Sequence, residues 1–325
     1  MLEIDAGRIA GEIAKSIGET VLRRLRRKGV VVGLSGGIDS SVTAALCTRS
    51  LGKDRVFGLL MPEGESSPDS LSFAQHLAET LGIASVVQDI GPALQAIGCY
   101  HQRDDAIRKV IPEYEAGWTS KIVLPKLSDG LDYALFSVVA QSPSGEIRRV
   151  RLTPEAYLGI VAATNFKQRT RKMLEYYHAD RLHYAVAGTP NRLEYAQGFF
   201  VKNGDGSADF KPIAHLYKTQ VYQLGRHLGI PEEILLRPPT TDTYSLEQSQ
   251  EEFYFCLPLE KMDLCLYGKN NGVPAETLAE AVGMSAHEVS RVFAMIDSRL
   301  NSTLYLHLSA QLVEPVAEVH LDSRH

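Results

Sequence analysis

The sequence GLSGGIDSS, at Gly33–Ser41, decides the fold expected of this chain. It follows the apolar run Val30–Val32, and SSVTAALCTRSLG continues from it with helical spacing. Glycines between a strand and a helix let the backbone approach an anion at the positive end of the helix dipole. The stretch lacks the Gly-Lys-Ser/Thr ending of the common nucleoside-triphosphatase loop and carries Asp39 instead. We therefore expect a phosphate-binding loop whose aspartate holds Mg²⁺; the alternative is a glycine-rich turn with Asp39 as helix N-cap.

Strand patterns and helix patterns alternate after this loop. Arg55–Pro62 and Ala84–Ile90 have the composition of buried strands, and Asp69–Gly82 between them has helical spacing. A further strand, LHYAVAGT, follows a helix predicted at Asn165–Arg181. Strands that alternate with helices of this length form parallel βαβ units, so we predict an α/β fold with a doubly wound parallel sheet. Ligands of such sheets bind beyond the carboxyl ends of the strands, where Ser35 lies.

Two stretches depart from this alternation. Within 111–157, YALFSVVAQ and IRRVRLT flank the turn residues SPSG, which predicts a β-hairpin within a β-rich insertion. Within 272–325, two helical segments are joined at GMS, which predicts a C-terminal helical extension. Their spacing is also that of a DNA-binding helix-turn-helix, but the second segment has few side chains suited to base edges. We expect a single domain over 1–325 that carries these two additions.

The composition limits the class of protein. The 325 residues are 44% hydrophobic and carry a net charge of -5, which argues against a general nucleic-acid binder, because such proteins need an excess of basic residues. The four cysteines include no Cys-x-x-Cys pair that could hold zinc, so we expect reduced thiols in the core. No apolar run approaches a membrane span, and the N-terminus lacks a signal-peptide core. A cytoplasmic protein without nucleic-acid or membrane partners is the simplest interpretation.

Three sequence blocks resemble one enzyme family. SGGIDSS resembles the Ser-Gly-Gly-x-Asp-Ser signature of the ATP-pyrophosphatase (PP-loop) superfamily. NFKQRTRKM, and the stretch from GTPNRLEYAQGFFVKNGDGSADF to HLYKTQ, resemble blocks of the ammonia-dependent NAD⁺ synthetases, in the family's order. The resemblance implies the Rossmann-like fold of the adenine nucleotide alpha-hydrolases and cleavage of ATP between its α and β phosphates.

The resemblance also implies an ATP site. Asp39 and Glu194 would be the carboxylates of a Mg²⁺ site. Lys218 would neutralise charge on the leaving pyrophosphate, so that Asp39 and Lys218 are the catalytic candidates. Glu194 taken singly would be an exposed helix residue, and its place within the block favours the site. The ATP-binding residues would be Gly33, Leu34, Ser35, Gly36, Gly37, Ile38, Asp39, Ser40, Thr189, Lys218 and Thr240.

The implied reaction joins ammonia to a carboxylate. The nicotinate carboxylate of deamido-NAD⁺ would attack the α-phosphorus of Mg·ATP and release pyrophosphate, and ammonia would then displace AMP to give NAD⁺. Arg169, Lys202 and Asp209 match positions that hold the dinucleotide acid, although each taken singly would be a surface charge or a turn residue. Free ammonia or a separate glutaminase chain would supply the nitrogen. The family's homodimer is expected here as well.

Three features depart from the family's pattern. The tail DSRLNSTLYLHLSAQLVEP has no His-Lys dipeptide, the stretch after Thr241 is only distantly similar, and the 111–157 insertion is additional. All three lie on the acceptor side or at the periphery. A related amide ligase for a different carboxylate is therefore the alternative function. A tRNA-modifying PP-loop enzyme is disfavoured, because such enzymes generally show a basic surface or catalytic cysteines.

Overall fold

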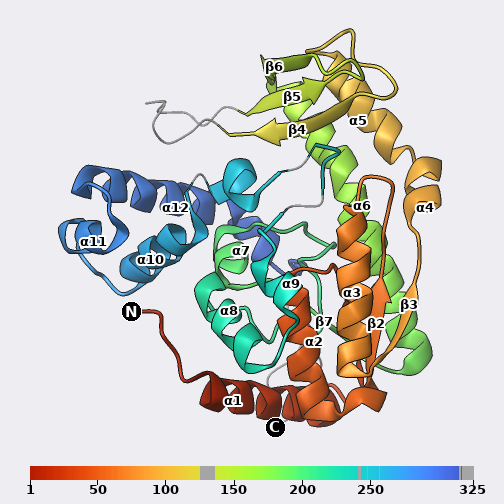
Figure 1. Ribbon diagram of the computed structural model, residues 1–325, viewed down its shortest axis with the longest axis vertical. Coiled ribbons are helices and arrows are strands. Elements are labelled where there is room, and N and C mark those ends of the chain that lie inside the picture. The colour runs from red at the N-terminus through yellow and green to blue at the C-terminus, as the bar shows by residue number, and fades with distance from the viewer. Residues whose placement is uncertain (125–135, 241–242, 247, 256, 315, 317–325) are drawn as a thin grey trace.

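The computed structural model describes residues 1–124, 136–240, 243–246, 248–255, 257–314 and 316. Its centre is a parallel sheet covered by helices, and a second, antiparallel sheet stands at one end of the molecule (Figure 1). The helices α10 (Leu259–Asn270), α11 (Ala275–Val282) and α12 (Ala286–His307) pack together at one side. α11 and α12 are the two predicted helices of the C-terminal extension, whereas α10 precedes that extension and was not predicted. The last residues of that predicted extension, 317–325, lie outside the described part.

The parallel sheet has the strand order β3-β2-β1-β7, which confirms the predicted α/β fold. β1 (Val30–Gly33) pairs with β2 (Val56–Leu60) on one side and with β7 (Ala185–Ala187) on the other, and β3 (Ala84–Val87) pairs with β2. The chain runs outward from β1 to β3 and later returns to β7, so the strand order reverses between β1 and β7. Doubly wound sheets bind ligands at the carboxyl ends of such a pair.

Helices surround this sheet. Those before α10 are α1 (Ala6–Gly18), α2 (Ile38–Leu51), α3 (Pro68–Leu81), α4 (Gly91–Ala96), α5 (Cys99–Arg108), α6 (Pro154–Leu182), α7 (Arg192–Gln197), α8 (Lys218–His227) and α9 (Glu232–Leu236), with short helical turns at Glu19–Arg24, Lys53–Arg55 and Glu251–Phe255. The apolar spacing predicted α2, α3 and the later part of α6, and the short helices fill the connections.

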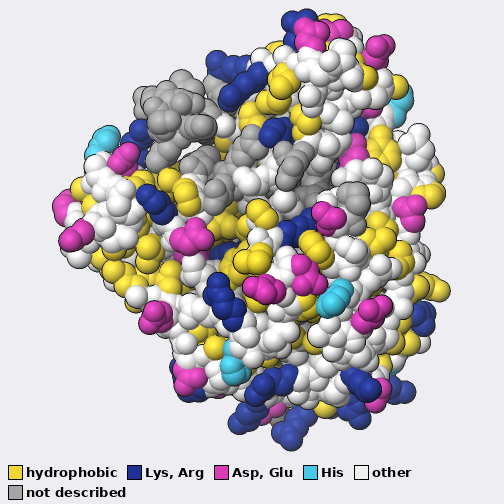
Figure 2. Space-filling view, viewed as in Figure 1, with side chains coloured by type: hydrophobic (Ala, Val, Ile, Leu, Met, Phe, Trp, Pro, Cys, Tyr) yellow, Lys and Arg dark blue, Asp and Glu magenta, His cyan; other side chains and the backbone are white. Residues whose placement is uncertain are grey.

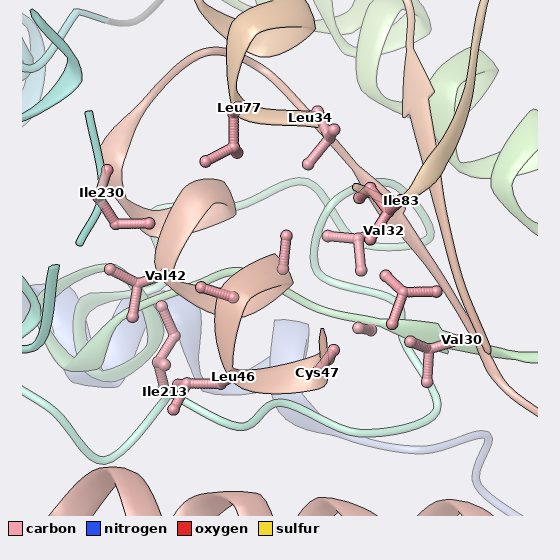
Figure 3. Close-up of a cluster of buried hydrophobic side chains, with 14 of the residues drawn as sticks. Val30, Val32, Leu34, Val42, Leu46, Cys47, Leu77, Ile83, Ile213 and Ile230 are labelled. Carbon is pink, nitrogen blue, oxygen red and sulfur yellow. The ribbon is translucent and has the colours of Figure 1, made fainter. Parts of the chain in front are cut away.

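The two faces of β1 are buried by different helices. Val30 and Val32 belong to a cluster with side chains of α1, α2, α3 and α8. Figure 3 shows part of this cluster, with Leu46 and Cys47 of α2 beside the strand residues. Val31 belongs to the opposite cluster, which includes residues of α4, α5 and α6. A strand buried on both faces has a continuous apolar run, which is why the sequence pattern identified β1.

Helix α6 begins earlier than predicted. The pattern placed its start at Asn165, but the helix starts at Pro154 and runs from the antiparallel sheet to the parallel sheet (Figure 1). The Thr153 side chain accepts a hydrogen bond from the N–H of Ala156 at 3.2 Å, and proline suits the first helical position. The helix ends at Leu182, and the C-cap residue His183 has φ of +57°. One rigid helix therefore connects the two sheets.

The antiparallel sheet contains the predicted hairpin and one further strand. β5 (Ser137–Gln141) and β6 (Ile147–Arg151) form the hairpin, and β4 (Thr119–Val123), which the pattern did not identify, pairs with β5. The first residues of the predicted hairpin, 133–135, lie outside the described part. The buried side chains of Ile122 and Val138 form a core with the start of α6. We call these three strands the β4–β6 sheet.

Three of the four cysteines lie in the core as free thiols, as predicted: Cys47, Cys99 and Cys265. Cys256 lies outside the described residues. Within the described ranges, no helix combines the length and apolar character needed to cross a membrane. Figure 2 shows acidic and basic side chains interspersed over one face, with Lys and Arg gathered at the end where α1 lies.

Candidate active site

The phosphate loop joins β1 to α2 in a conformation that requires glycine. Gly36 has φ of +73°, which glycine adopts readily and other residues adopt at a cost. A Cβ atom at Gly36 would lie 2.4 Å from the carbonyl oxygen of Ser70 in α3. The loop is therefore packed against α3 at a distance that leaves no room for a side chain.

Serine hydroxyls hold the loop at the start of α2. The carbonyl oxygen of Gly37 accepts hydrogen bonds from the hydroxyls of Ser40 at 3.0 Å and Ser41 at 2.8 Å. The Ser35 hydroxyl accepts from the N–H of Gly37 at 3.3 Å. Gly37 occupies the N-cap position without a side-chain bond, and Asp39 lies in the first turn of the helix. The alternative in which Asp39 caps α2 is therefore wrong, and its carboxylate has other partners.

A pocket of about 420 Å³ lies at the carboxyl ends of β1 and β7. Parts of the chain that are far apart in the sequence contribute to it, among them the phosphate loop, α6, the stretch after β7, the start of α8 and the stretch after α9. Gly36 is not among the lining residues and packs against Ser70, which is one of them. The other predicted nucleotide and metal residues all line the pocket: Gly33, Leu34, Ser35, Gly37, Ile38, Asp39, Ser40, Thr189, Glu194, Lys218 and Thr240.

Asp39 and Lys218 form a buried ion pair in this pocket. Lys218 Nζ donates to Asp39 Oδ2, and Asn191 Nδ2 donates to Asp39 Oδ1 at 3.1 Å. The side chains of Lys218 and Asp39 are 3% and 16% exposed. Burial alone would lower the pKa of Lys218, but the carboxylates of Asp39 and Glu194 raise this pKa above its ordinary value. Lys218 is therefore held as a cation beside the phosphate loop.

A carboxylate from another helix fixes the position of Lys218. Asp263 of α10, which is 0% exposed, accepts hydrogen bonds from the backbone N–H groups of Lys218 at 3.2 Å and Thr219 at 2.7 Å. Burial raises the pKa of Asp263 to about 6, against the opposing effects of these hydrogen bonds and of the Lys218 charge. The carboxylate satisfies N–H groups that the first turn of α8 leaves without helical partners. The C-terminal helices thus position the cation of the site.

Glu194 is held in the first turn of α7 by a capping box. The N–H of Glu194 donates to Asn191 Oδ1 at 3.2 Å, and the N–H of Asn191 donates to Glu194 Oε2 at 3.1 Å. Gln250 Nε2 donates to the other carboxylate oxygen, Oε1, at 3.2 Å. Because Asn191 is also bonded to Asp39, one buried asparagine ties the two predicted metal carboxylates to the same end of the pocket.

The environment of these two carboxylates fits a divalent cation. Burial and the charge of Asp39 raise the pKa of Glu194 to about 8. A cation between the two carboxylates would remove this repulsion, and Mg²⁺ prefers such oxygen ligands. In the part of the chain that the structure describes, no three His, Cys, Asp or Glu side chains are grouped to hold a metal. A cation held by Asp39 and Glu194 would take its remaining ligands from other groups, such as water or a bound anion.

The three predicted acceptor residues lie outside the lining of this pocket. Lys202 Nζ donates to the carbonyl oxygens of Tyr305 at 2.7 Å and Leu308 at 3.0 Å, so it caps the end of α12. Arg169 is exposed, and its Nε donates to the carbonyl oxygen of Lys202 at 3.3 Å. Asp209 accepts from the N–H of Val186 in β7 at 2.7 Å. The structure thus brings Arg169 and Lys202 together and gives Asp209 a bond to the sheet.

The C-terminal helix reaches the rim of the pocket. The ring of His307, near the end of α12, lies edge-on to the rings of Tyr195 at 4.8 Å and Phe200 at 5.1 Å between centroids. Phe200 is a pocket-lining residue. The tail therefore contacts the pocket wall although it has no His-Lys dipeptide.

Several residues of the site were not singled out from the sequence. Arg237 Nη2 donates to the Ser70 hydroxyl at 2.8 Å and lines the pocket beside the phosphate loop. Asn191, Gln250 and Asp263 complete the contacts described above. Asn191 stands within GTPNRLE, at the start of the block that resembles the family, so the sequence did contain a signal for it. Asp263 and Gln250 stand in stretches whose local pattern gives no indication of a site.

Comparisons with known proteins place the chain in a family. The sequence profile described as NAD synthase matches residues 9–113 and 147–301. The chain is 58% identical over 318 residues to the "NH(3)-dependent NAD(+) synthetase" of Rhizobium meliloti, covering 98% of this chain and 95% of that protein. It is 40% identical over 220 residues to the protein of the same description from Thermotoga neapolitana, covering 66% and 69% of the two chains.

Two solved structures share the fold. One is described as NMN synthetase from Francisella tularensis, with a TM-score of 0.62 and 22% identity over 95% of this chain and 99% of that one. The other is an NH3-dependent NAD synthetase from Campylobacter jejuni, with a TM-score of 0.62 and 23% identity over 96% and 100%. At these identities the two structures bear on the fold alone. The family profile and the two sequence relatives decide the assignment: this chain belongs to the NAD synthase family.

Proposed function

We propose that this protein is an ATP-dependent amide ligase that converts deamido-NAD⁺ and ammonia to NAD⁺, with release of AMP and pyrophosphate. The observation that carries the proposal is the contact of Asp39, in the first turn after the phosphate loop, with Lys218, because both residues line one pocket. A cation held beside a phosphate loop stabilises charge that develops on a leaving pyrophosphate. Membership of the NAD synthase family, and relatives described as NH(3)-dependent NAD(+) synthetases, support the same reaction.

The residues of the pocket would act mainly by positioning and by charge. The glycine-rich backbone at Gly36 and Gly37, followed by the start of α2, would bind the β and γ phosphates of ATP. Lys218 would donate to phosphate oxygens as the bond between the α and β phosphates breaks, exchanging part of its contact with Asp39. Asp39 and Glu194 would hold Mg²⁺, which supplies further positive charge at the phosphates. Thr189 and Thr240 would complete the ATP site.

Two bond exchanges make up the reaction. A carboxylate oxygen of the acceptor attacks the α-phosphorus of ATP, the bond to the β phosphate breaks, and pyrophosphate leaves. Ammonia then attacks the acyl carbon of the adenylate, loses a proton to solvent, and the carbon–oxygen bond breaks to release AMP. Neither step requires a strong general base, because the acceptor is ionised and ammonia is itself the nucleophile. Placement of the reactants in the pocket supplies the main acceleration.

The acceptor side of the site is assigned to Arg169, Lys202 and Asp209. Two cations and one carboxylate suit the phosphates and a ribose hydroxyl of a dinucleotide. The contact between Arg169 and the backbone of Lys202 supports a common role for these two residues. A different carboxylate is the second candidate, because the tail of the chain has no His-Lys dipeptide.

We further infer a cytoplasmic homodimer that uses free ammonia or ammonia from a separate glutaminase chain. Light scattering of the purified protein tests the dimer. The function itself is tested by incubating the protein with ATP, Mg²⁺ and ammonium together with deamido-NAD⁺ or nicotinate mononucleotide. Formation of NAD⁺ and AMP, with at least a tenfold preference in kcat/KM for deamido-NAD⁺, is expected. Formation of ADP, or a preference for the mononucleotide, would contradict the proposal.

A further inference from the structure

Strand β4 is hydrogen-bonded to a segment that lines the candidate active site. This segment, residues 238–250, is described at 238–240, 243–246 and 248–250. The N–H of Ser120 in β4 donates to the Ser245 hydroxyl at 2.8 Å, and the N–H of Leu246 donates to the carbonyl oxygen of Ser120 at 3.2 Å. Gln248, which is 3% exposed, donates from Nε2 to the carbonyl oxygen of Ile122. Ser245, Leu246 and Gln248 of the 238–250 segment are thus bonded to β4 through both backbone and side-chain groups.

The same segment presents two groups to the pocket. Thr240 is bridged to Ser249 in an antiparallel pairing, and the N–H of Gln250 donates to the carbonyl oxygen of Pro239 at 3.1 Å. These contacts join the two ends of the segment. Thr240 and Gln250 both line the pocket, and Gln250 donates to Glu194, one of the two carboxylates assigned to Mg²⁺. A shift of the segment along β4 would therefore move groups at the reaction site.

The β4–β6 sheet also contributes directly to the pocket wall. The ring of Phe136, which directly precedes β5, is stacked on the ring of Tyr157 in α6, with 4.5 Å between centroids and 18° between planes. Both side chains line the pocket. β4 and β5 lie between residues 113 and 147, in the stretch that the NAD synthase profile leaves unmatched. A part of the chain that the profile leaves unmatched thus contributes to the wall of the candidate active site.

A second anchor holds the segment from the other side. Lys167 of α6, which is 1% exposed, donates from Nζ to the carbonyl oxygen of Thr243 at 2.8 Å. Its ammonium also pairs with Glu63 at 2.9 Å and Glu65 at 2.6 Å. Tyr244, 5% exposed, belongs to the core of the β4–β6 sheet. The segment is therefore fixed before and after residue 244, and its two pocket-lining ends extend from this fixed centre.

We propose that the β4–β6 sheet is a positioning element of the reaction site, in which Ser245 and Gln248 set the place of Thr240 and Gln250 in the pocket. This inference rests on the proposed function, because it gives the two positioned groups a role toward Mg·ATP. Ser245 and Gln248 are positioning residues: their side chains contact β4 and act on the nucleotide through the segment. Their effect falls on the ATP side of the reaction and leaves ammonia binding unchanged.

The kinetic test uses the variants Gln248→Leu and Ser245→Ala/Gln248→Leu. Leucine is close to glutamine in volume, and Gln248 Oε1 is buried without a hydrogen-bond partner among the described groups, so Gln248→Leu is expected to fold. Loss of contacts worth about 1.4 kcal/mol corresponds to a tenfold change in an equilibrium constant. We expect the double variant to raise the KM for Mg·ATP about tenfold and to leave the KM for ammonium within about twofold.

Ser144→Ala is the matched control. Ser144 lies at the turn between β5 and β6, where its hydroxyl contacts that of Ser142 at 2.8 Å, and both are exposed or partly exposed. This variant removes a serine hydroxyl from the same sheet without touching the 238–250 segment, so its KM values should equal those of the unmodified protein. A double variant whose KM for Mg·ATP stays within about twofold, or whose KM for ammonium rises equally, would overturn the proposal.

Hydrogen exchange of the ligand-free protein separates this inference from the proposed function. The amide of Leu246, which donates to Ser120, is expected to exchange at least tenfold faster in the double variant than in Ser144→Ala. Equal exchange rates would overturn the positioning role even if NAD⁺ is formed. Failure of the unmodified protein to form NAD⁺, with slow exchange at Leu246, would count against the proposed function and not against the attachment of the segment to β4.

Discussion

Replacing Gly36 by alanine is expected to disturb the phosphate loop far more than replacing Gly52. The two glycines flank α2, and both have positive φ, +73° at Gly36 and +82° at Gly52. A Cβ atom at Gly36 would lie 2.4 Å from the carbonyl oxygen of Ser70, whereas nothing lies within 4 Å of a Cβ atom at Gly52. The pair of variants therefore separates the cost of the backbone conformation from the cost of the close approach to α3.

The expected losses in the free energy of unfolding follow from these two costs, the backbone conformation and the close approach to α3. An alanine held in a backbone region suited to glycine costs roughly 1 to 3 kcal/mol, and this cost applies at both positions. At Gly36 the clash must also be relieved by moving the loop or the first turn of α3, which adds about 1 to 3 kcal/mol, as overpacking does. Gly36→Ala should therefore lower the free energy of unfolding by about 1 to 3 kcal/mol more than Gly52→Ala.

Urea unfolding of the ligand-free proteins measures this difference, and steady-state kinetics measures its effect on the site. The KM for Mg·ATP is expected to rise at least tenfold in Gly36→Ala, because the displaced loop is the proposed phosphate site, and to stay within about twofold in Gly52→Ala. Equal losses of stability in the two variants would refute the close approach. An unchanged KM for Mg·ATP in Gly36→Ala would refute the assignment of the phosphate site.

Three further predictions follow from the contacts of the site. Lys218→Ala should lower kcat/KM by about 100-fold to 1000-fold, as loss of a group that stabilises transition-state charge does; steady-state kinetics checks this, and a loss under about tenfold would contradict it. Burial raises the pKa of the Asp263 carboxyl group to about 6, so this group binds a proton more tightly in the folded protein than in the unfolded chain. The protein should therefore lose stability as the pH rises from about 4 to 6. Asp263→Asn should reduce that pH dependence by roughly 2 to 3 kcal/mol in denaturant unfolding, and identical pH profiles would argue against it. Lys202→Ala should lower the free energy of unfolding by about 1 kcal/mol and speed hydrogen exchange at the end of α12, because Lys202 bonds the carbonyl oxygens of Tyr305 and Leu308. Unchanged exchange there would exclude the capping role.

The parts of the fold that the sequence predicted are those with local signals. β1, the phosphate loop and α2 are contiguous, and each has its own pattern of apolar residues, glycines and hydroxyl side chains. The position of Lys218 beside Asp39 came from the resemblance to a family, because nothing local specifies a contact between residues so far apart in the chain. Asp263 shows where prediction from local patterns ends. Its carboxylate reaches the N–H groups of α8 only when α10 packs against α8, and no local pattern specifies that packing.

The parts that the sequence did not predict depend on non-local pairing. β4 is a short strand whose register is set by β5 and whose outer edge is occupied by the 238–250 segment. Neither contact leaves a periodic signal in the residues concerned. The start of α6 was placed too late because a helix of mixed polarity that is buried in several directions has little amphipathic pattern before Asn165. The roles of Arg169, Lys202 and Asp209 toward an acceptor stay predictions.

Transfer of ¹⁸O tests the central claim most directly. When the acceptor's nicotinate carboxylate carries ¹⁸O, attack on the α-phosphorus places one labelled oxygen between carbon and phosphorus, and the later attack of ammonia leaves that oxygen on AMP. Mass spectrometry of the products of a reaction with deamido-NAD⁺, Mg·ATP and ammonium is expected to show one ¹⁸O in AMP for each NAD⁺ formed, with unlabelled pyrophosphate. Label in inorganic phosphate together with ADP, or NAD⁺ formed with unlabelled AMP, would contradict the account.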